Sequence, residues 1–318
     1  EDLFILRWGQ PDFVRQFIAA QAGRDYVGGV IIGSECYIPA LDYLTKEGPH
    51  KNWKYAFERQ WLFYRVWGRL LYNAGTADRV FEREFEARFG RGRGETLLAA
   101  WKLAGQVPLH FASFHQGRAD GTLYTEGFSS WRDNGERKLF DIDSFITHPV
   151  LDTKRYQNIS DFVAGKGDMP ADVLSPSALA TELDRISAQT AKLVRAIRQT
   201  GKVSQPLECE LTDLDAWCAF AGYFAEKLRA GVALAQARAT GDLVLQQSAV
   251  AALERAQGHW RRLSELGARF NQLPAPSNSK EPFSWASLQP AVDRDIELAR
   301  TPLSGRTTVS TNNLSPRK

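Results

Sequence analysis

The chain has 318 residues, of which 43% are hydrophobic and 24% are charged, and its formal net charge is +3. This length can bury a sizeable core, whereas the small net charge without a basic block excludes a surface built to bind nucleic-acid phosphates. No apolar run approaches the ~20 residues of a membrane span, and the Ser/Thr/Pro-rich residues 301–318 predict a disordered tail.

Residues 3–8 (LFILRW) and 27–32 (VGGVII) are short apolar runs. Gly9 follows the first run and Gly33-Ser34 follows the second, as expected for buried strands that lead into tight turns. Between them, an amphipathic helix is predicted that opens at 10–12 and runs through about residue 21, with Pro11 in its first turn. Strand, helix and strand form a βαβ unit, which favours parallel strands. The pattern is typical of strands in a parallel barrel.

Glu35 follows the second predicted strand directly, after the Gly33-Ser34 turn. In (β/α)8 barrels the catalytic groups stand at the carboxyl ends of the strands, so the position favours a functional carboxylate. A turn cap or an ion pair with an arginine is an equally good explanation, and both stay open.

Two parallel strands cannot close a sheet, and the first begins within three residues of Glu1. The single methionine is Met169, and no apolar segment has the form of a signal peptide. We therefore expect the sequence to be a piece of a longer protein, whose earlier strands lie outside it.

Residues 53–73 carry aromatic side chains on nearly every side of a predicted helix, which must therefore be largely buried. Core packing is the favoured explanation for most of these rings. Trp67, Arg69 and Tyr72 are the side chains that could still reach a sugar. Two further helices are predicted, over 77–89 and 94–103.

Residues 106–168 have an irregular pattern and are rich in side chains that often serve function. Aromatic rings cover the apolar faces of pyranoses, while carboxylates and arginines bind hydroxyls or uronate carboxyls. His115, Asp120, Glu126 and Trp131 are therefore candidates for a sugar site. Anchoring of the loop by the same side chains is the open alternative.

Neither a metal nor a cofactor is expected. His110 and His115 are five residues apart, whereas a zinc-binding helical pair requires four with an acid between them. Cys36, Cys209 and Cys218 have neither an even count nor a zinc spacing. The glycines of 90–94 follow a predicted helix and match neither phosphate-binding fingerprint.

Residues 175–300 predict a helical bundle. Apolar side chains recur at helical spacing over 177–200, 211–240 and 243–270, and short connections make these helices antiparallel. A last short helix is predicted over 289–299. The domain organisation predicted for the whole chain is 1–75 for the end of a barrel, 76–174 for helices and a long loop packed on it, 175–300 for the bundle, and 301–318 for the tail.

Five successive segments carry a resemblance to a known family: ILRWGQPDFVRQF, VGGVIIGSECYI, YAFERQWLFYRVWGRLLYN, TADRVFEREFEARFG and SFHQGRADGTLYTEGF. Over residues 1–165 the chain resembles the C-terminal end of (β/α)8 glycoside hydrolases of the alpha-glucuronidase-like, polysaccharide-degrading type. The helices that follow resemble the helical domain such enzymes carry after the barrel. The resemblance implies an α-rich α/β fold, with the last two β/α units of a TIM-type barrel followed by a helical bundle.

The activity that the resemblance implies is hydrolysis of glycosidic bonds in a polysaccharide or oligosaccharide, uronic-acid-containing ones included. Glu35 would be catalytic. Substrate would be bound by Arg7, Trp8, Tyr37, His115, Asp120, Glu126 and Trp131. Such an enzyme is expected in the periplasm or outside the cell, without a nucleic-acid partner.

One feature departs from the family. Glycoside cleavage usually employs two carboxyl groups, and no second carboxylate on an adjacent strand end can be matched to Glu35. The alternative is a non-catalytic helical module that binds carbohydrate or protein.

Overall fold

The computed structural model describes residues 5–30, 41–114, 129–131, 137–166, 170, 172–275 and 282–303, and helices dominate it. The α-helices are α1 (Pro11–Gln21), α2 (Ala56–Arg59), α3 (Trp61–Tyr72), α4 (Asp78–Phe89), α5 (Gly94–Ala104), α6 (Gln106–Phe114), α7 (Ile142–Thr147), α8 (Ile159–Val163), α9 (Pro176–Gln199), α10 (Gln205–Thr240), α11 (Leu243–Phe270) and α12 (Gln289–Arg300). A 3₁₀ turn, η2 (Ala286–Leu288), precedes α12. The strands β1 (Ser129–Trp131) and β2 (Arg137–Leu139) pair antiparallel, with Ser129 opposite Leu139.

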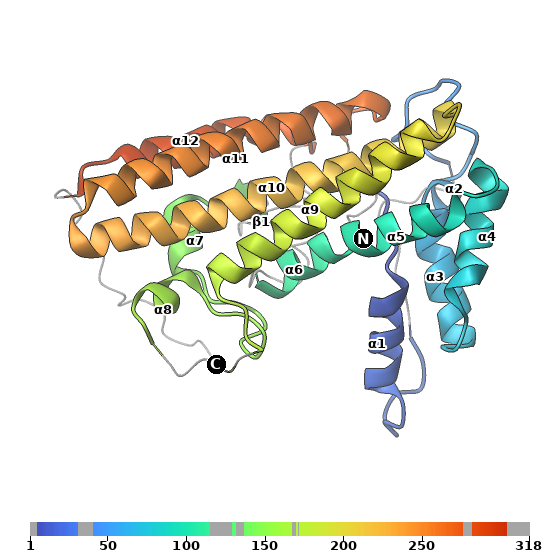
Figure 1. The fold of residues 1–318 in the computed structure, drawn as a ribbon, viewed down its shortest axis with the longest axis horizontal. Helices are drawn as coiled ribbons and strands as arrows, with labels where there is room; N and C mark the ends of the chain where they lie inside the picture. Colours follow the sequence, from blue (N-terminus) through green and yellow to red (C-terminus); the bar gives the residue numbers. More distant parts are fainter. Residues whose placement is uncertain are drawn as a thin grey trace.

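The three longest helices, α9, α10 and α11, run side by side along the long axis of the molecule (Figure 1). Ser175, Ser204 and Asp242 cap their N-termini, each accepting a hydrogen bond from a backbone N–H of the first turn. Helix α10 ends at Gly241, whose φ of 74° closes the turn into α11. Because α10 lies between α9 and α11, it is buried on nearly every side.

The N-terminal helices pack against this bundle through α5, which lies on α9 (Figure 1). Helix α4 packs on α5 in turn, and Gly94 at the start of α5 meets the carbonyl oxygen of Glu82 so closely that no Cβ would fit. Helix α1 packs on α3. Helices α2, α3 and α4 thus gather at one end of the long helices, and α7 and α8 lie toward the other (Figure 1).

One continuous hydrophobic core runs through the molecule from Ile5 to Ala299 and includes residues of all three large predicted segments. Its largest fully buried side chains include Trp101, Trp217 and Trp260. The domain boundaries at 75 and 174 stay predictions. Among the residues that the structure describes, none of the helices combines the length and apolar character that crossing a membrane requires.

The predicted strand over residues 3–8 is wrong for the part that is described. Residues 5–8 are buried but irregular. Their backbone polar groups form hydrogen bonds with side chains of helices. The indole of Trp217 donates to the carbonyl of Arg7 at 2.9 Å, and the N–H of Arg7 donates to Asp213 at 3.2 Å. Arg59 donates to the carbonyl of Ile5. Bonds that a neighbouring strand would supply come instead from α10 and α2.

The second predicted strand, over 27–32, is also wrong where it is described. Residues 27–30 are irregular, and Val30 is 36% exposed, whereas a barrel strand would bury it. The described part of the chain is therefore an α-rich fold, and it contains no β/α unit of a TIM-type barrel.

Two helical predictions also need correction. The helix predicted over 53–73 is two helices, α2 and α3, which are separated at Gln60. The irregular stretch over 106–168 contains α6, α7 and α8. Asp141 and Asn158 cap α7 and α8, each accepting from a backbone N–H three residues on.

Candidate functional site

A groove of about 470 Å³ opens where α1, α3 and α6 meet the segment that carries Arg155 and Tyr156. We call it the aromatic groove. Its lining residues are Trp8, Gln10, Phe13, Gln16, Phe63, Trp67, Gln106, Pro108, Leu109, His110, Ala112, Ser113, Arg155 and Tyr156.

One wall of the aromatic groove is a set of interlocking rings. The centroids of Trp8 and Phe13 lie 6.0 Å apart, those of Trp8 and Phe63 5.9 Å, and those of Phe13 and Trp67 6.4 Å. Edge-to-face and tilted contacts of this kind fix the orientation of each ring. Phe13, Phe63 and Trp67 are half-buried, so part of each ring faces the groove.

The chain around Trp8 is anchored by hydrogen bonds. The indole N–H of Trp8 donates to the carbonyl of Gly105 at 3.0 Å. The amide oxygen of Gln10 accepts from the N–H of Phe13 at 2.7 Å and so caps α1. Gln106 donates to the carbonyl of Lys102 at 3.0 Å. Amide side chains therefore lie beside the rings in a fixed frame.

His110 and Tyr156 form the buried polar part of the groove. Nδ1 of His110 lies 2.9 Å from the phenolic oxygen of Tyr156, and His110 is 5% exposed. Burial, and then the charge of Arg155, lowers the pKa of His110 to about 4. Burial raises the pKa of Tyr156 to about 12. At neutral pH the two groups are uncharged and share one hydrogen bond.

Arg155 is exposed, with its guanidinium 5.8 Å from the centroid of the Tyr156 ring. Within the described residues this guanidinium makes no ion pair. Beyond it lies a second hollow of about 470 Å³, which we call the polar hollow. Its lining residues are Gln106, His110, Arg155, Leu174, Ala178, Thr181 and Glu182.

Glu182 is the carboxylate of the polar hollow. Arg185 donates to its two oxygens at 2.6 and 2.7 Å. These hydrogen bonds lower the pKa of Glu182, so it is ionised at neutral pH.

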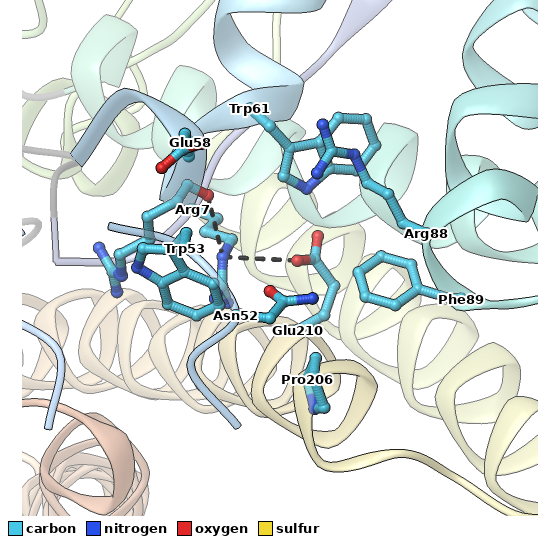
Figure 2. A pocket seen from close by; sticks show the side chains of 10 residues that line it. Arg7, Asn52, Trp53, Glu58, Trp61, Arg88, Phe89, Pro206 and Glu210 are labelled. Atoms are coloured by element: carbon cyan, nitrogen blue, oxygen red, sulfur yellow. Dashed lines mark hydrogen bonds and ion pairs between the residues drawn. The ribbon is translucent and has the colours of Figure 1, made fainter. Parts of the chain in front are cut away.

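Arg7 faces a different place, a smaller hollow of about 120 Å³ beside α10 (Figure 2). Its Nε lies 3.4 Å from Glu210, and its Nη1 lies 2.8 Å from Asp213. Figure 2 shows Trp53 beside Arg7, and the ring centroid lies 5.2 Å from the guanidinium carbon. Arg7 is 2% exposed, so these contacts hold the loop of residues 5–10 to α10.

Two carboxylates, Glu58 and Glu210, line this smaller hollow (Figure 2). Glu58 accepts from the N–H groups of Lys54 and Tyr55, both at 2.9 Å, and so caps α2. Glu210 is 1% exposed, and burial raises its pKa while Arg7 opposes the shift. Both carboxylates are engaged in holding local structure.

The predicted site residues fall into four groups. Trp8 lines the aromatic groove, and Arg7 lies in the buried ion-pair cluster. Trp131 lies in β1, opposite Arg137. Residues outside the described part are Glu35, Tyr37, His115, Asp120 and Glu126. The functional roles of all of them stay predictions.

Of the three residues singled out between 53 and 73, Trp67 lines the aromatic groove. Arg69 is exposed and Tyr72 is 93% exposed, and neither lines the groove. Sequence reasoning did not single out Phe13, Phe63, Gln106, Arg155 or Tyr156 for this groove. A signal was present for Phe63, because it stands four residues before Trp67 and so shares its helix face.

No protein-family model matches this sequence, and no curated protein matches it. A solved structure does match, and it is described as a "GH138 enzyme targeting pectin rhamnogalacturonan II". The TM-score is 0.69 over 94% of this chain and 46% of that chain, at 12% sequence identity. The chain therefore shares its fold with the part of that enzyme that it covers. The likeness does not extend to the alpha-glucuronidase-like type, and the chain spans less than half the length of that structure.

Proposed function

We propose that this chain is part of a carbohydrate-active enzyme that hydrolyses glycosidic bonds in a polysaccharide or oligosaccharide. The observation that carries the proposal is the aromatic groove. Partly exposed rings of Phe13, Phe63 and Trp67 stand beside the amides of Gln10 and Gln106. Rings cover the apolar faces of a sugar and amides bind its hydroxyls, and pockets of ~300–1,000 Å³ are typical of ligand sites.

The fold supports the same class of function. The similar structure is an enzyme that, by its description, targets pectin rhamnogalacturonan II, so pectin-derived oligosaccharides are the first ligands to test. This likeness does not favour the alternative of a non-catalytic module. A uronic acid in the substrate is the finer proposal, because a carboxylate could pair with the Arg155 guanidinium at the groove.

Glu35 is the carboxylate that we propose as catalytic. Replacing it with Gln removes the proton-transfer and nucleophilic capacity of the side chain while keeping its shape. If Glu35 acts on the reacting bond, Glu35→Gln lowers kcat by at least ~10²-fold with little change in sugar affinity. A change confined to KM would make it a binding residue.

The test combines binding and turnover for the whole chain with pectin-derived and, for comparison, xylan-derived oligosaccharides. Binding measured by calorimetry, with release of reducing ends that Glu35→Gln abolishes, supports the enzyme. Binding without release would instead support the non-catalytic module. A folded sample that binds no oligosaccharide at millimolar concentration would contradict both.

A further inference from the structure

We propose that the site takes at least two consecutive sugar units, one on the aromatic groove and the next in the polar hollow. This inference rests on the proposed function and deepens it. It makes the ligand a chain of sugars held by two neighbouring subsites of different chemistry.

The two hollows are neighbours. The aromatic groove and the polar hollow share Gln106, His110 and Arg155 as lining residues, and each measures about 470 Å³. Each falls within the range of ~300–1,000 Å³ of ligand pockets. A ligand that occupies both therefore passes along the junction formed by these three side chains.

The two hollows offer different chemistry. The aromatic groove presents Trp8, Phe13, Phe63 and Trp67, whereas the residues that line the polar hollow include no Phe, Tyr or Trp. A sugar in the groove is held by stacking on ring faces. A sugar in the polar hollow is held by hydrogen bonds to its hydroxyls.

Glu182 is suited to bind those hydroxyls. Each of its oxygens accepts one hydrogen bond from Arg185 and keeps further acceptor capacity. The neighbouring hydroxyl of Thr181 donates to the carbonyl of Ser177 at 3.0 Å, so it can accept from a ligand. Both side chains thus match hydroxyl donors.

Arg155 is the side chain that links the two units. It lines both hollows, and within the described part of the chain its guanidinium has no carboxylate partner. A guanidinium offers five N–H donors in a fixed plane, enough to bond oxygens of two adjacent sugars. Loss of Arg155 should therefore weaken binding of a disaccharide more than that of a monosaccharide.

The experiment is calorimetric titration of the whole chain with a pectin-derived uronic acid, as the monosaccharide, and with the disaccharide of the same uronic acid. For the unaltered chain we expect the disaccharide to bind at least about tenfold more tightly than the monosaccharide. Glu182→Gln should remove most of this gain and leave monosaccharide binding unchanged, whereas Arg155→Gln should weaken the disaccharide by a larger factor than the monosaccharide. Trp67→Ala should weaken both ligands by a similar factor.

The matched control is Glu265→Gln. Like Glu182, Glu265 pairs with an arginine three residues away, Arg262 at 3.3 Å, but this pair lies on the exposed face of α11. The control should leave both affinities unchanged.

Equal affinity for monosaccharide and disaccharide would overturn the two-unit site while keeping the proposed function. Loss of monosaccharide binding in Glu182→Gln would overturn the assignment of subsites. No binding of either sugar to folded protein would overturn the proposed function as well.

Discussion

The ammonium group of Lys227 on α10 lies 2.8 Å from the carboxylate of Asp295 on α12, and both side chains are almost completely buried. Lys227 also donates to the carbonyl of Phe140 at 2.5 Å, and Asp295 accepts from the N–H of Ile142 at 2.7 Å. The pair therefore joins α10, α12 and the start of α7 by charge-assisted hydrogen bonds.

Replacing Lys227 by Met would leave the carboxylate of Asp295 buried without its cation. We expect the free energy of unfolding to fall by about 3–5 kcal/mol, as measured by urea denaturation. The exposed pair of Arg262 and Glu265 supplies the control, since Arg262→Met should change stability by less than about 1 kcal/mol. Equal losses in the free energy of unfolding for the two substitutions would show that burial does not set the contribution of the Lys227 pair.

Arg7 offers a test that separates structure from sugar binding. Arg7→Met would strand Glu210 and Asp213 in a buried site, so the free energy of unfolding should again fall by about 3–5 kcal/mol. Because Arg7 does not line the aromatic groove, the affinity of the folded protein for oligosaccharide should stay unchanged. Weaker binding by a folded Arg7→Met sample would instead support the prediction that Arg7 binds substrate.

His110 makes stability depend on pH. Its folded pKa of about 4 lies below the ordinary value of 6.5, so between these values the unfolded chain binds more protons. Stability from His110 is therefore present above pH 6.5 and lost as pH falls toward 4, by at most about 3 kcal/mol. The charges near it are Arg155, Glu182 and Arg185.

The measurement is the free energy of unfolding against pH for the unaltered chain and for His110→Gln. Burial lowers the pKa of His50, His148 and His259 too, so the difference between the two proteins isolates His110. The slope between pH 4 and 6.5 should be shallower for His110→Gln. Parallel curves would show that His110 titrates normally.

Two glycines, one in α5 and one in α3, give opposite predictions. Gly94→Ala would drive a methyl group into the carbonyl of Glu82 and should cost about 1–3 kcal/mol or more of stability. Gly68, within α3, has nothing within 4 Å of a Cβ, so Gly68→Ala should stabilise by up to about 1 kcal/mol. Thermal unfolding of both variants checks this, and a stabilised Gly94→Ala would contradict the close packing of α4 and α5.

The bundle helices were predictable because their signals are local. The apolar repeat over 243–270 and the cap at Asp242 specify α11 without reference to the rest of the chain. The irregular conformation of residues 5–8 was not predictable, because a short apolar run does not show which groups will hydrogen-bond its backbone. Here the partners are Asp213 and Trp217, more than 200 residues away.

Only part of the candidate site was predictable from the sequence, for the same reason. Aromatic content pointed to Trp67 and the family resemblance to Trp8, whereas the contact of His110 with Tyr156 depends on tertiary packing between segments 46 residues apart. Arg155 carried no sequence signal, because a single arginine between a lysine and a tyrosine has no pattern. Its role follows only from its place between the two hollows.

The central claim is that the aromatic groove binds saccharide, and calorimetry of two variants of one helix tests it most directly. Trp67 lines the groove and Tyr72, also on α3, is 93% exposed outside it. Trp67→Ala should weaken binding of a pectin-derived oligosaccharide at least about tenfold, and Tyr72→Ala should leave it unchanged. Equal affinity of both folded variants and the unaltered chain would place the sugar elsewhere and contradict the account.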